Sequence, residues 1–362
     1  MKKTFLNVLK YSFGLLLGAF FLYLAFRNAE ADEIWQAVRA VRPGWLLLSL
    51  GVGLFSHYLR GARWQMQLRA SGYSPSKLNL FAAVMTNYLV NQALPRAGEI
   101  VRCSVLYKSD RVPLTKALGT VVIERVFDLL ILVFLIVLAF LLEFDTIQRF
   151  LDEVFGSESA GRSGVPLWLL IMAGGGLLGL GLLWWLREPL MRIPVVRRVG
   201  NFLRELIQSA LSIRYLERPW LFVVYTFTIW LCYWMMTYIA FHSMAGFEQV
   251  EMNWLYLSLI TTVMGGIGMA MPVPGGTGPY HFAVKFTFIA LLVGGSREFA
   301  ATLGQSFAVV MHSSQLIMMV VFGLLGYVYL WLKPPVDASL PPSAETPLSA
   351  ETEAAHLPVA DS

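Results

Sequence analysis

The sequence predicts an all-α, polytopic integral membrane protein made of two inverted-topology halves, each with spanning helices and a broken or re-entrant helical hairpin. Of its 362 residues, 57% are hydrophobic and only 14% are charged, whereas a soluble domain carries about 25% charged residues. Long apolar segments alternate with clusters of Lys and Arg, as membrane spans alternate with cytoplasmic loops. Pro and Gly interrupt one apolar segment in each half, a pattern typical of transporters.

The first half is predicted to cover about residues 5–142. Its first apolar run, about 5–26, exceeds the roughly 7–15 residues of a signal-peptide core and is interpreted as a span. A cleaved signal peptide is the alternative, because Ala29-Glu30-Ala31 offers a small-x-small site. The other predicted elements are an interfacial amphipathic helix at 28–42 and helices at 45–64, 78–94, 97–108 and 118–142.

The second half is predicted to cover about residues 166–332. It repeats the order of span, span, broken hairpin and long helix, although the letters of the two halves show no convincing identity. The whole of 1–332 is therefore expected to form one transmembrane domain, followed by a disordered cytoplasmic tail at 333–362 that is rich in Pro, Ser, Ala and Glu. The predicted elements of this half are 166–186, 220–244, 254–271, 280–293 and 299–332.

Placement of Lys and Arg predicts the orientation of these elements. Residues 60–77 and 187–218 are basic and are assigned to the cytoplasm with both termini, while the acidic stretch 143–165 is assigned to the outside. Residues 78–116 and 254–297 must then each enter and leave on one side, as a re-entrant hairpin or as a pair of crossing helices. The expected location is the cell membrane, meaning the inner or cytoplasmic membrane, with multiple passes.

The first broken segment concentrates charge among apolar helices. Charged residues at the bilayer centre cost about 2.5–3.5 kcal/mol each on insertion scales and usually face an interior site. The arginines suit an anion such as phosphate, because guanidinium is a planar, permanently charged fork. A buried ion-pair network without ligand is the alternative, and both can hold. The candidate substrate-binding residues here are Asn87, Asn91, Arg96, Glu99, Arg102, Glu124, Arg125 and Asp128.

The second broken segment, PVPGGTGP at 272–279, is poor in charge but rich in backbone freed from helix. Its glycines allow close approach to a ligand, and the N–H groups at the start of the next helix predict an anion-binding nest. A simple kink between packed helices is the alternative. The candidate substrate-binding residues of this segment are Gly275, Gly276, Gly278, His281 and Lys285.

Arg60 and Arg63 at the end of the second span allow two interpretations. They can anchor the span at headgroup level beside Tyr58 and Trp64, as basic and aromatic residues often do. Alternatively, Arg60 lines a polar cavity. The sequence does not decide between these.

Signals for chemistry are missing elsewhere. The two cysteines, Cys103 and Cys232, form no CxxC pattern, and neither a disulfide framework nor a metal-ligand spacing is present. No nucleophile stands beside an obvious histidine base. We therefore expect no catalytic residue, no metal, no cofactor and no nucleic-acid partner.

Three motifs in order resemble the transmembrane domain of the lysylphosphatidylglycerol synthetase/flippase family. They are Asn87 with Pro95-Arg96-x-Gly98-Glu99-x-x-Arg102, then Ala117-Leu118 with Glu124-Arg125-x-x-Asp128, then Pro272-x-Pro274-Gly275-Gly276-x-Gly278. The resemblance implies a lipid-translocating membrane domain over about residues 5–332. It also implies a single-domain member, because the family's soluble synthase domain has no counterpart after residue 332. Where the family commonly has a carboxylate, this chain has His281.

The resulting expectation is a flippase or transporter, not an enzyme, that moves an anionic lipid between leaflets. The lipid would be a phospholipid or a polyprenyl-phosphate-linked lipid, and an aminoacylated headgroup stays open. Two alternatives remain: an intramembrane enzyme acting on a lipid phosphate, and a non-transporting partner of a lipid-modifying complex. The expected partners are membrane lipids with anionic headgroups, with a homo-oligomer or a separate lipid-modifying enzyme left open.

Overall fold

The computed structural model describes residues 16–26, 31–142 and 216–333, which lie in one compact unit. These residues are helical and include no strand, so the predicted all-α class is confirmed for them. The predicted span at 166–186, the acidic stretch at 143–165, nearly all of the basic connection at 187–218 and the tail from 334 onward lie outside the described residues.

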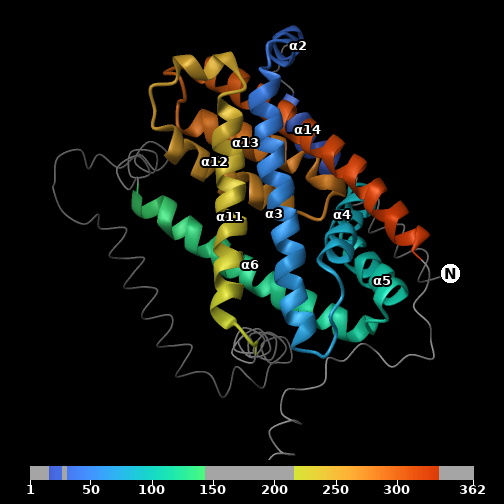
Figure 1. Cartoon of the computed structure of the whole chain (residues 1–362). Helices are drawn as coiled ribbons and strands as arrows, with labels where there is room; N and C mark the ends of the chain where they lie inside the picture. The colour runs from blue at the N-terminus through green and yellow to red at the C-terminus, as the bar shows by residue number, and fades with distance from the viewer. Residues whose placement is uncertain (1–15, 27–30, 143–215, 334–362) are drawn as a thin grey trace, which may run out of the picture. The chain divides into compact units, whose positions relative to one another are not determined.

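The first half follows the predicted order (Figure 1). A helix at Leu16–Phe26 belongs to the first predicted span. Helix α3, predicted at 45–64, is longer than predicted: it begins at Pro43 and continues past Arg60 and Arg63 to Arg69. The remaining elements are α2 (Ala31–Arg39), α3 (Pro43–Arg69), α4 (Lys77–Ala93), α5 (Gly98–Asp110) and α6 (Leu114–Leu142).

The described part of the second half, from residue 216 on, contains a long helix, a broken hairpin and a further long helix in the order that α3 to α6 show. A short 3-10 helix that the sequence did not predict closes the loop after its first described helix, and a second one forms within the Pro/Gly segment. The elements are α11 (Pro219–Phe241), η2 (Ala245–Gln249), α12 (Trp254–Ala270), η3 (Pro274–Gly276), α13 (Pro279–Ala290) and α14 (Arg297–Leu332).

Corresponding helices in the two halves begin with the same local chemistry. Both α3 and α11 start at an Arg-Pro pair, with the proline at the first helical turn, where its missing N–H costs nothing. The hairpin helices α4 and α12 both have 17 residues and a side-chain cap. Ser76 accepts from Asn79 N, and Asn253 accepts from Leu255 N. These capping and proline signals begin α3 and α11, and α4 and α12, in the same way.

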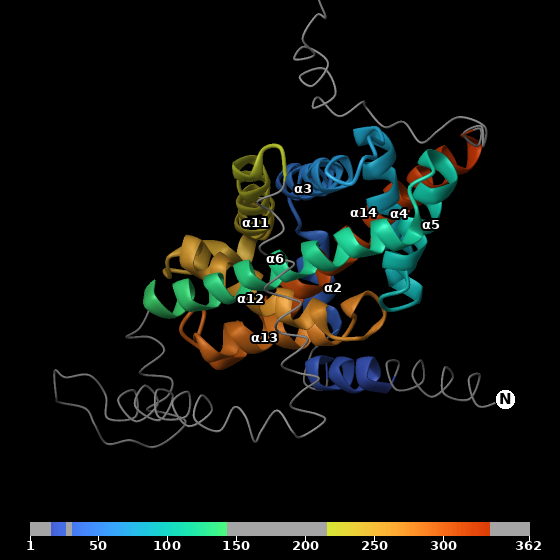
Figure 2. The ribbon, with the colours of Figure 1, turned by 90° about the horizontal axis from the view of Figure 1, so that it is seen from below.

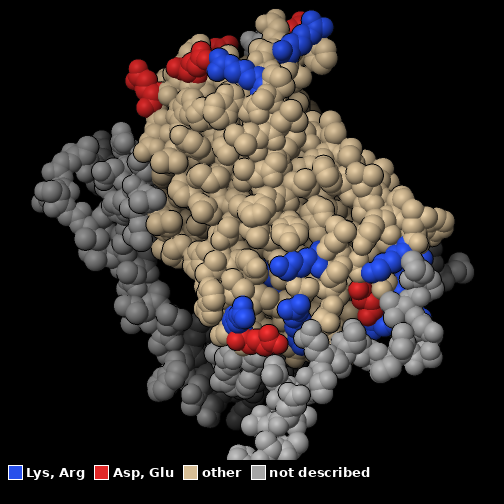
Figure 3. Space-filling model, viewed as in Figure 1, with Lys and Arg blue, Asp and Glu red and all other residues tan. Residues whose placement is uncertain are grey.

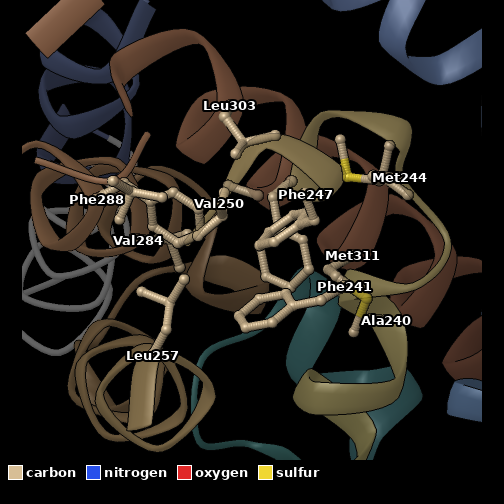
Figure 4. Packing of buried hydrophobic residues seen from close by; sticks show 14 of the residues in the cluster. Ala240, Phe241, Met244, Phe247, Val250, Leu257, Val284, Phe288, Leu303 and Met311 are labelled. Atoms are coloured by element: carbon tan, nitrogen blue, oxygen red, sulfur yellow. The ribbon is translucent and has the colours of Figure 1, made fainter. Parts of the chain in front are cut away.

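One hydrophobic cluster lies at the end of the α12–α13 hairpin that is opposite its Pro/Gly turn, which we call the open end (Figure 4). Phe241 at the end of α11 stacks on Phe247 of η2, with ring centroids 4.1 Å apart. Phe288 near the end of α13 and Leu303 near the start of α14 complete the packing. The start of α3 lies at the same end, because Arg42 N donates to Ser243 O at 2.8 Å.

A second hydrophobic cluster lies at the open end of the α4–α5 hairpin. It joins Trp64 of α3, Leu80 of α4, Leu106 of α5 and Leu330 of α14. Leu330 lies 27 residues after Leu303 along the same helix, which corresponds to about 40 Å at 1.5 Å per residue. The two hairpins therefore open at opposite ends of α14.

The tips of the two hairpins meet between these clusters. Arg96 Nη2 of the first tip donates to Ala270 O, the last residue of α12, at 3.2 Å. A Cβ on Gly275 would collide with the Gln92 side chain of α4. Gly275 also has a φ of 57°, so only glycine fits without strain. The close approach of the second tip to the first thus depends on glycine.

Two helices from different halves form the centre of this arrangement. Helices α3 and α11 lie side by side, and α6 crosses both of them (Figures 1 and 2). Helix α14 packs along α4, and α13 packs along α14. Each hairpin is therefore held against the long last helix of the second half.

Apolar side chains cover much of the outside of these helices. On the face in Figure 3, charged side chains gather at two ends, with an uncharged belt between them. Helices α11 and α14 are long and apolar enough to cross a membrane, while Leu16–Phe26 and α12 are shorter apolar helices. Many of the exposed large hydrophobic residues lie on three helices, and examples are Leu130, Phe134, Val224, Phe227, Leu231, Val321, Leu324 and Leu325.

Candidate functional site

A network of arginines and carboxylates lies inside the bundle, where α3, α5, α6 and α11 meet. Its members come from the motif of the first broken segment and from the end of α3. We call it the arginine network. It consists of Arg60, Arg63, Glu99, Arg102, Glu124, Arg125 and Asp128.

Arg102 of α5 and Glu124 of α6 form its most buried pair. Arg102 Nη2 donates to Glu124 Oε2 at 2.9 Å, and the two side chains are 1% and 0% exposed. The guanidinium carbon also lies 4.5 Å from the ring centroid of Trp64, a cation–π contact. Trp64 is fixed in turn, because its Nε1 donates to Thr120 Oγ1 at 2.7 Å. This pair ties the first hairpin to α6.

Asp128 of α6 holds three arginines. Arg60 donates to its Oδ2, and Arg63 Nη2 donates to its Oδ1 at 3.0 Å. Arg63 also donates to Thr226 Oγ1 of α11 at 3.1 Å. Arg125 Nη1 lies 3.8 Å from Asp128 Oδ2. One carboxylate therefore joins α3 and α6, and Arg63 extends the connection to α11.

Arg125 is the loosely held member of the network. Its Nη2 lies 3.7 Å from Glu99 Oε1, so both of its ion pairs are longer than a hydrogen bond. Its side chain is 45% exposed, whereas the other arginines of the network are buried. This guanidinium can take an anion without a full break of a buried pair.

The charges of the network do not balance. Within the part of the chain that the structure describes, four guanidiniums contact three carboxylates, which leaves one positive charge. Buried charge without a partner is costly. The excess is therefore best placed at Arg125, and it favours a ligand with negative charge.

The other predicted residues of the first segment lie at its tip. Asn91 Oδ1 accepts from Gly98 N at 2.9 Å and so closes the turn into α5. Asn87 is buried against Gly98, where an added Cβ would meet the Asn87 carbonyl. Arg96 is exposed and has a left-handed φ of 63°. Its contact with Ala270 O joins it to the end of α12, and among the described residues it forms no ion pair with the arginine network.

The second broken segment forms a separate group around the first helix. Gly276 N and Thr277 N, just before α13, donate to the carbonyls of Val273 and Pro274 inside the turn, whereas the anion nest is predicted at the start of α13 itself. Gly278, with a φ of 98°, lies against Gly18 and Leu22 of the helix Leu16–Phe26.

Two side chains of α13 continue this contact. Lys285 Nζ donates to Ala25 O at 2.6 Å, which places its charge at the carboxyl end of the first helix. The His281 ring lies 4.9 Å from His312 of α14 and 5.8 Å from Phe26. The sequence-predicted site thus divides into an ionic network and a glycine turn that packs on the first helix.

Sequence reasoning missed part of the network on α3. Arg60 and Arg63 are buried, so the interpretation as headgroup anchors is wrong and the cavity alternative for Arg60 fits the burial. The signal was present, because His57, Arg60, Arg63 and Gln67 repeat at the spacing of one helix face. Arginines that only anchor a span at the headgroups would lie at its end, whereas these polar residues follow one face over about three turns of α3.

The chain matches the family described as the lysylphosphatidylglycerol synthase TM region over residues 11–327. The chain belongs to this family. It is accordingly a membrane protein of the lysylphosphatidylglycerol synthase TM family, and the resemblance drawn from the three motifs is confirmed.

Three curated relatives share shorter stretches. A UPF0104 membrane protein of Methanocaldococcus jannaschii is 26% identical over 132 residues, covering 36% of this chain and 39% of its own. Glycosyltransferase AglD of Haloferax volcanii is 30% identical over 118 residues, covering 32% of this chain and 19% of its own. A UPF0104 membrane protein of Methanothermobacter thermautotrophicus is 30% identical over 109 residues, covering 29% of this chain and 32% of its own. The chain thus spans well under half of each relative, and no solved structure matches it.

The buried pair makes a prediction about stability. Arg102→Gln should lower the free energy of unfolding by about 3–5 kcal/mol, because it leaves Glu124 buried and unpaired. Arg125→Gln should cost less than about 1 kcal/mol, because its pairs are long and half-exposed. The measurement is unfolding of the purified variants in detergent. Arg102→Gln combined with Glu124→Gln should be less damaging than Arg102→Gln alone, and equal losses would contradict a coupled pair.

Proposed function

We propose that this protein is a flippase or transporter that moves an anionic lipid between the leaflets of a cell membrane. The observation that carries the proposal is Arg125, a half-exposed arginine with long ion pairs in a network that has one positive charge in excess. A lipid phosphate would bind this guanidinium. Arg60, Arg63 and Arg102 keep the neighbouring carboxylates engaged, so that the charge of Arg125 stays available.

The distribution of polarity supports a lipid as the ligand. Exposed apolar residues on α6, α11 and α14 suit contact with acyl chains, while the charged groups lie inside the bundle. A lipid headgroup that entered the bundle could keep its acyl chains outside. The membership of the chain in a lipid-related membrane family fits this arrangement.

The hairpins support movement between two leaflets. They open at opposite ends of α14 and meet at their tips, which is the arrangement expected of inverted repeats around a midplane site. In this proposal the chain crosses the membrane several times, and both hairpins are re-entrant. Opposite openings would let a headgroup reach the network from each side in turn. Both termini would then be cytoplasmic.

An enzyme that acts on a lipid phosphate is the second candidate, because arginines also stabilise phosphate in transition states. Among the residues that the structure describes, no group of three or more His, Cys, Asp or Glu side chains is placed to hold a metal ion. The meeting of two hairpins with opposite openings has a direct role in transport and none that is needed for hydrolysis. Reconstituted vesicles assayed in parallel for lipid movement and for released headgroup separate the two candidates.

Loss of Arg125 should stop transport without unfolding the protein. In vesicles with a fluorescent anionic phospholipid, Arg125→Gln should slow translocation at least about tenfold, because a charge-assisted hydrogen bond contributes about 1.5–3 kcal/mol. The matched control is Lys116→Gln, which removes an exposed charge from the same helix. Equal slowing in both variants would argue for a general charge effect and against an Arg125 site.

The orientation of the hairpins can be tested with single cysteines. We expect Lys108→Cys to be labelled from the cytoplasmic side and Ser296→Cys from the outside by a membrane-impermeant maleimide. Both positions are exposed, whereas the neighbouring Ser109 is buried. The background should carry Cys103→Ala and Cys232→Ala, since these are the two native cysteines. Labelling of both positions from one side would exclude the inverted arrangement.

A further inference from the structure

Two tyrosines from different halves converge on one nitrogen of Arg60. Arg60 Nη1 donates to Tyr88 Oη of α4 at 3.0 Å and to Tyr233 Oη of α11 at 3.1 Å. Both tyrosines are half-buried, while Arg60 behind them is buried. Their hydroxyls therefore lie at the edge of the arginine network with a fixed charge behind them.

The hydrogen bonds of this pair leave one donor over. Guanidinium has no acceptor, so each phenol oxygen accepts from Arg60 and keeps its own hydrogen to donate. Even a hydrogen bond between the two hydroxyls would use only one of these hydrogens. None of the hydrogen bonds among the described residues uses the second hydrogen. One phenol is thus left to donate to a group from outside.

His57 adds an unsatisfied nitrogen at the same place. It lies one turn before Arg60 on α3 and is 5% exposed, and its ring centroid is 4.5 Å from that of Tyr88 and 6.4 Å from that of Tyr233. Its Nδ1 is buried and has no hydrogen-bond partner among the described residues. A hydroxyl both donates and accepts, so it can satisfy the free phenol and either tautomer of the imidazole. A phosphate oxygen accepts only.

We propose that His57, Tyr88 and Tyr233 form a subsite for a hydroxyl group in the headgroup of the transported lipid. The ligand class is an anionic phospholipid whose headgroup carries a hydroxyl beyond its phosphodiester, as in a glycerol or a sugar. This rests on the proposed function in assigning the phosphate to Arg125. Asp128 connects the two places, because Arg60 and Arg125 both contact its Oδ2.

The subsite explains why the tyrosines come from both halves. Tyr88 lies on the first hairpin and Tyr233 on the helix that runs beside α3. A headgroup hydroxyl held by both would join the hairpin to the opposite half while the phosphate occupies Arg125. Headgroup choice would then follow from hydrogen bonding, and charge alone would not set it.

A pair of lipids with equal charge tests the subsite. Phosphatidylglycerol and phosphatidylpropanol with identical acyl chains differ only in the headgroup hydroxyls. Their binding is measured by competition against a fluorescent anionic lipid, with the purified protein in detergent. The wild-type protein should prefer phosphatidylglycerol about tenfold, because a site built for a hydroxyl is left unpaired by the analogue.

The variants identify the groups responsible. Tyr88→Phe combined with Tyr233→Phe should abolish the preference, because it weakens binding of phosphatidylglycerol more than that of phosphatidylpropanol. His57→Leu should weaken the preference. The control is Tyr58→Phe, which removes a phenol oxygen from the neighbouring position on α3 and should keep the full preference.

Three results would overturn the subsite. They are equal affinity of the wild-type protein for both lipids, a preference that survives in the double variant, and a parallel loss of affinity for both lipids in that variant. The last would show that the tyrosines only support the network. The outcome is separate from that of the proposed function, because vesicles that move both lipids equally would support transport and exclude the subsite. Selective binding of phosphatidylglycerol without any translocation would support the subsite and exclude transport.

Discussion

The packing of charge inside the bundle depends on Asp128. An arginine among apolar helices is tolerated only with a partner, and Asp128 partners three of them at once. Without this carboxylate, Arg60 and Arg63 would lose the ion pairs that they form within 4 Å among the described residues. The contact of α3 with α6, and through Arg63 with α11, follows from this one residue.

The same constraint sets which arginine of the network is most exposed and most loosely paired. Arg102 is enclosed by Glu124 and Trp64, and its hydrogen bond has ordinary length. Arg125 shares Asp128 with two better-placed competitors, so its own pairs stay long. An excess of one positive charge is therefore located at the most exposed guanidinium of the network. In the proposed function, the buried arginines hold the helices together and Arg125 binds the ligand.

The order of the helices was largely predictable from the sequence, because apolar length and Pro/Gly interruptions are local signals. Ser76 and Asn253 cap the matching helices α4 and α12, and Pro43 and Pro219 begin α3 and α11. The carboxylates and arginines of α5 and α6 were also predictable as a network, since they share helix faces. Helices α11 and α14 are long and apolar enough to cross a membrane, and crossing by the other helices stays a prediction.

The partners across the bundle were not predictable in the same way. That Arg60 meets Tyr88 and Tyr233 requires α3, α4 and α11 to be neighbours, which no local pattern reports. Lys285 was expected beside a ligand, but its contact with Ala25 O depends on where the first helix packs. Arg96 was grouped with the other arginines by its motif, yet the tip of the hairpin turns it toward α12.

In the proposed function, Arg125 receives the phosphate of an anionic lipid inside the bundle. An electron cryomicroscopy map of the protein in nanodiscs of anionic phospholipid tests this most directly. If Arg125 binds the phosphate, the map should show density for one lipid headgroup with its phosphate within hydrogen-bond distance of the Arg125 guanidinium, and Arg102 should remain paired with Glu124. Lipid density confined to the outer apolar belt, with Arg125 still turned to Glu99 and Asp128, would contradict it.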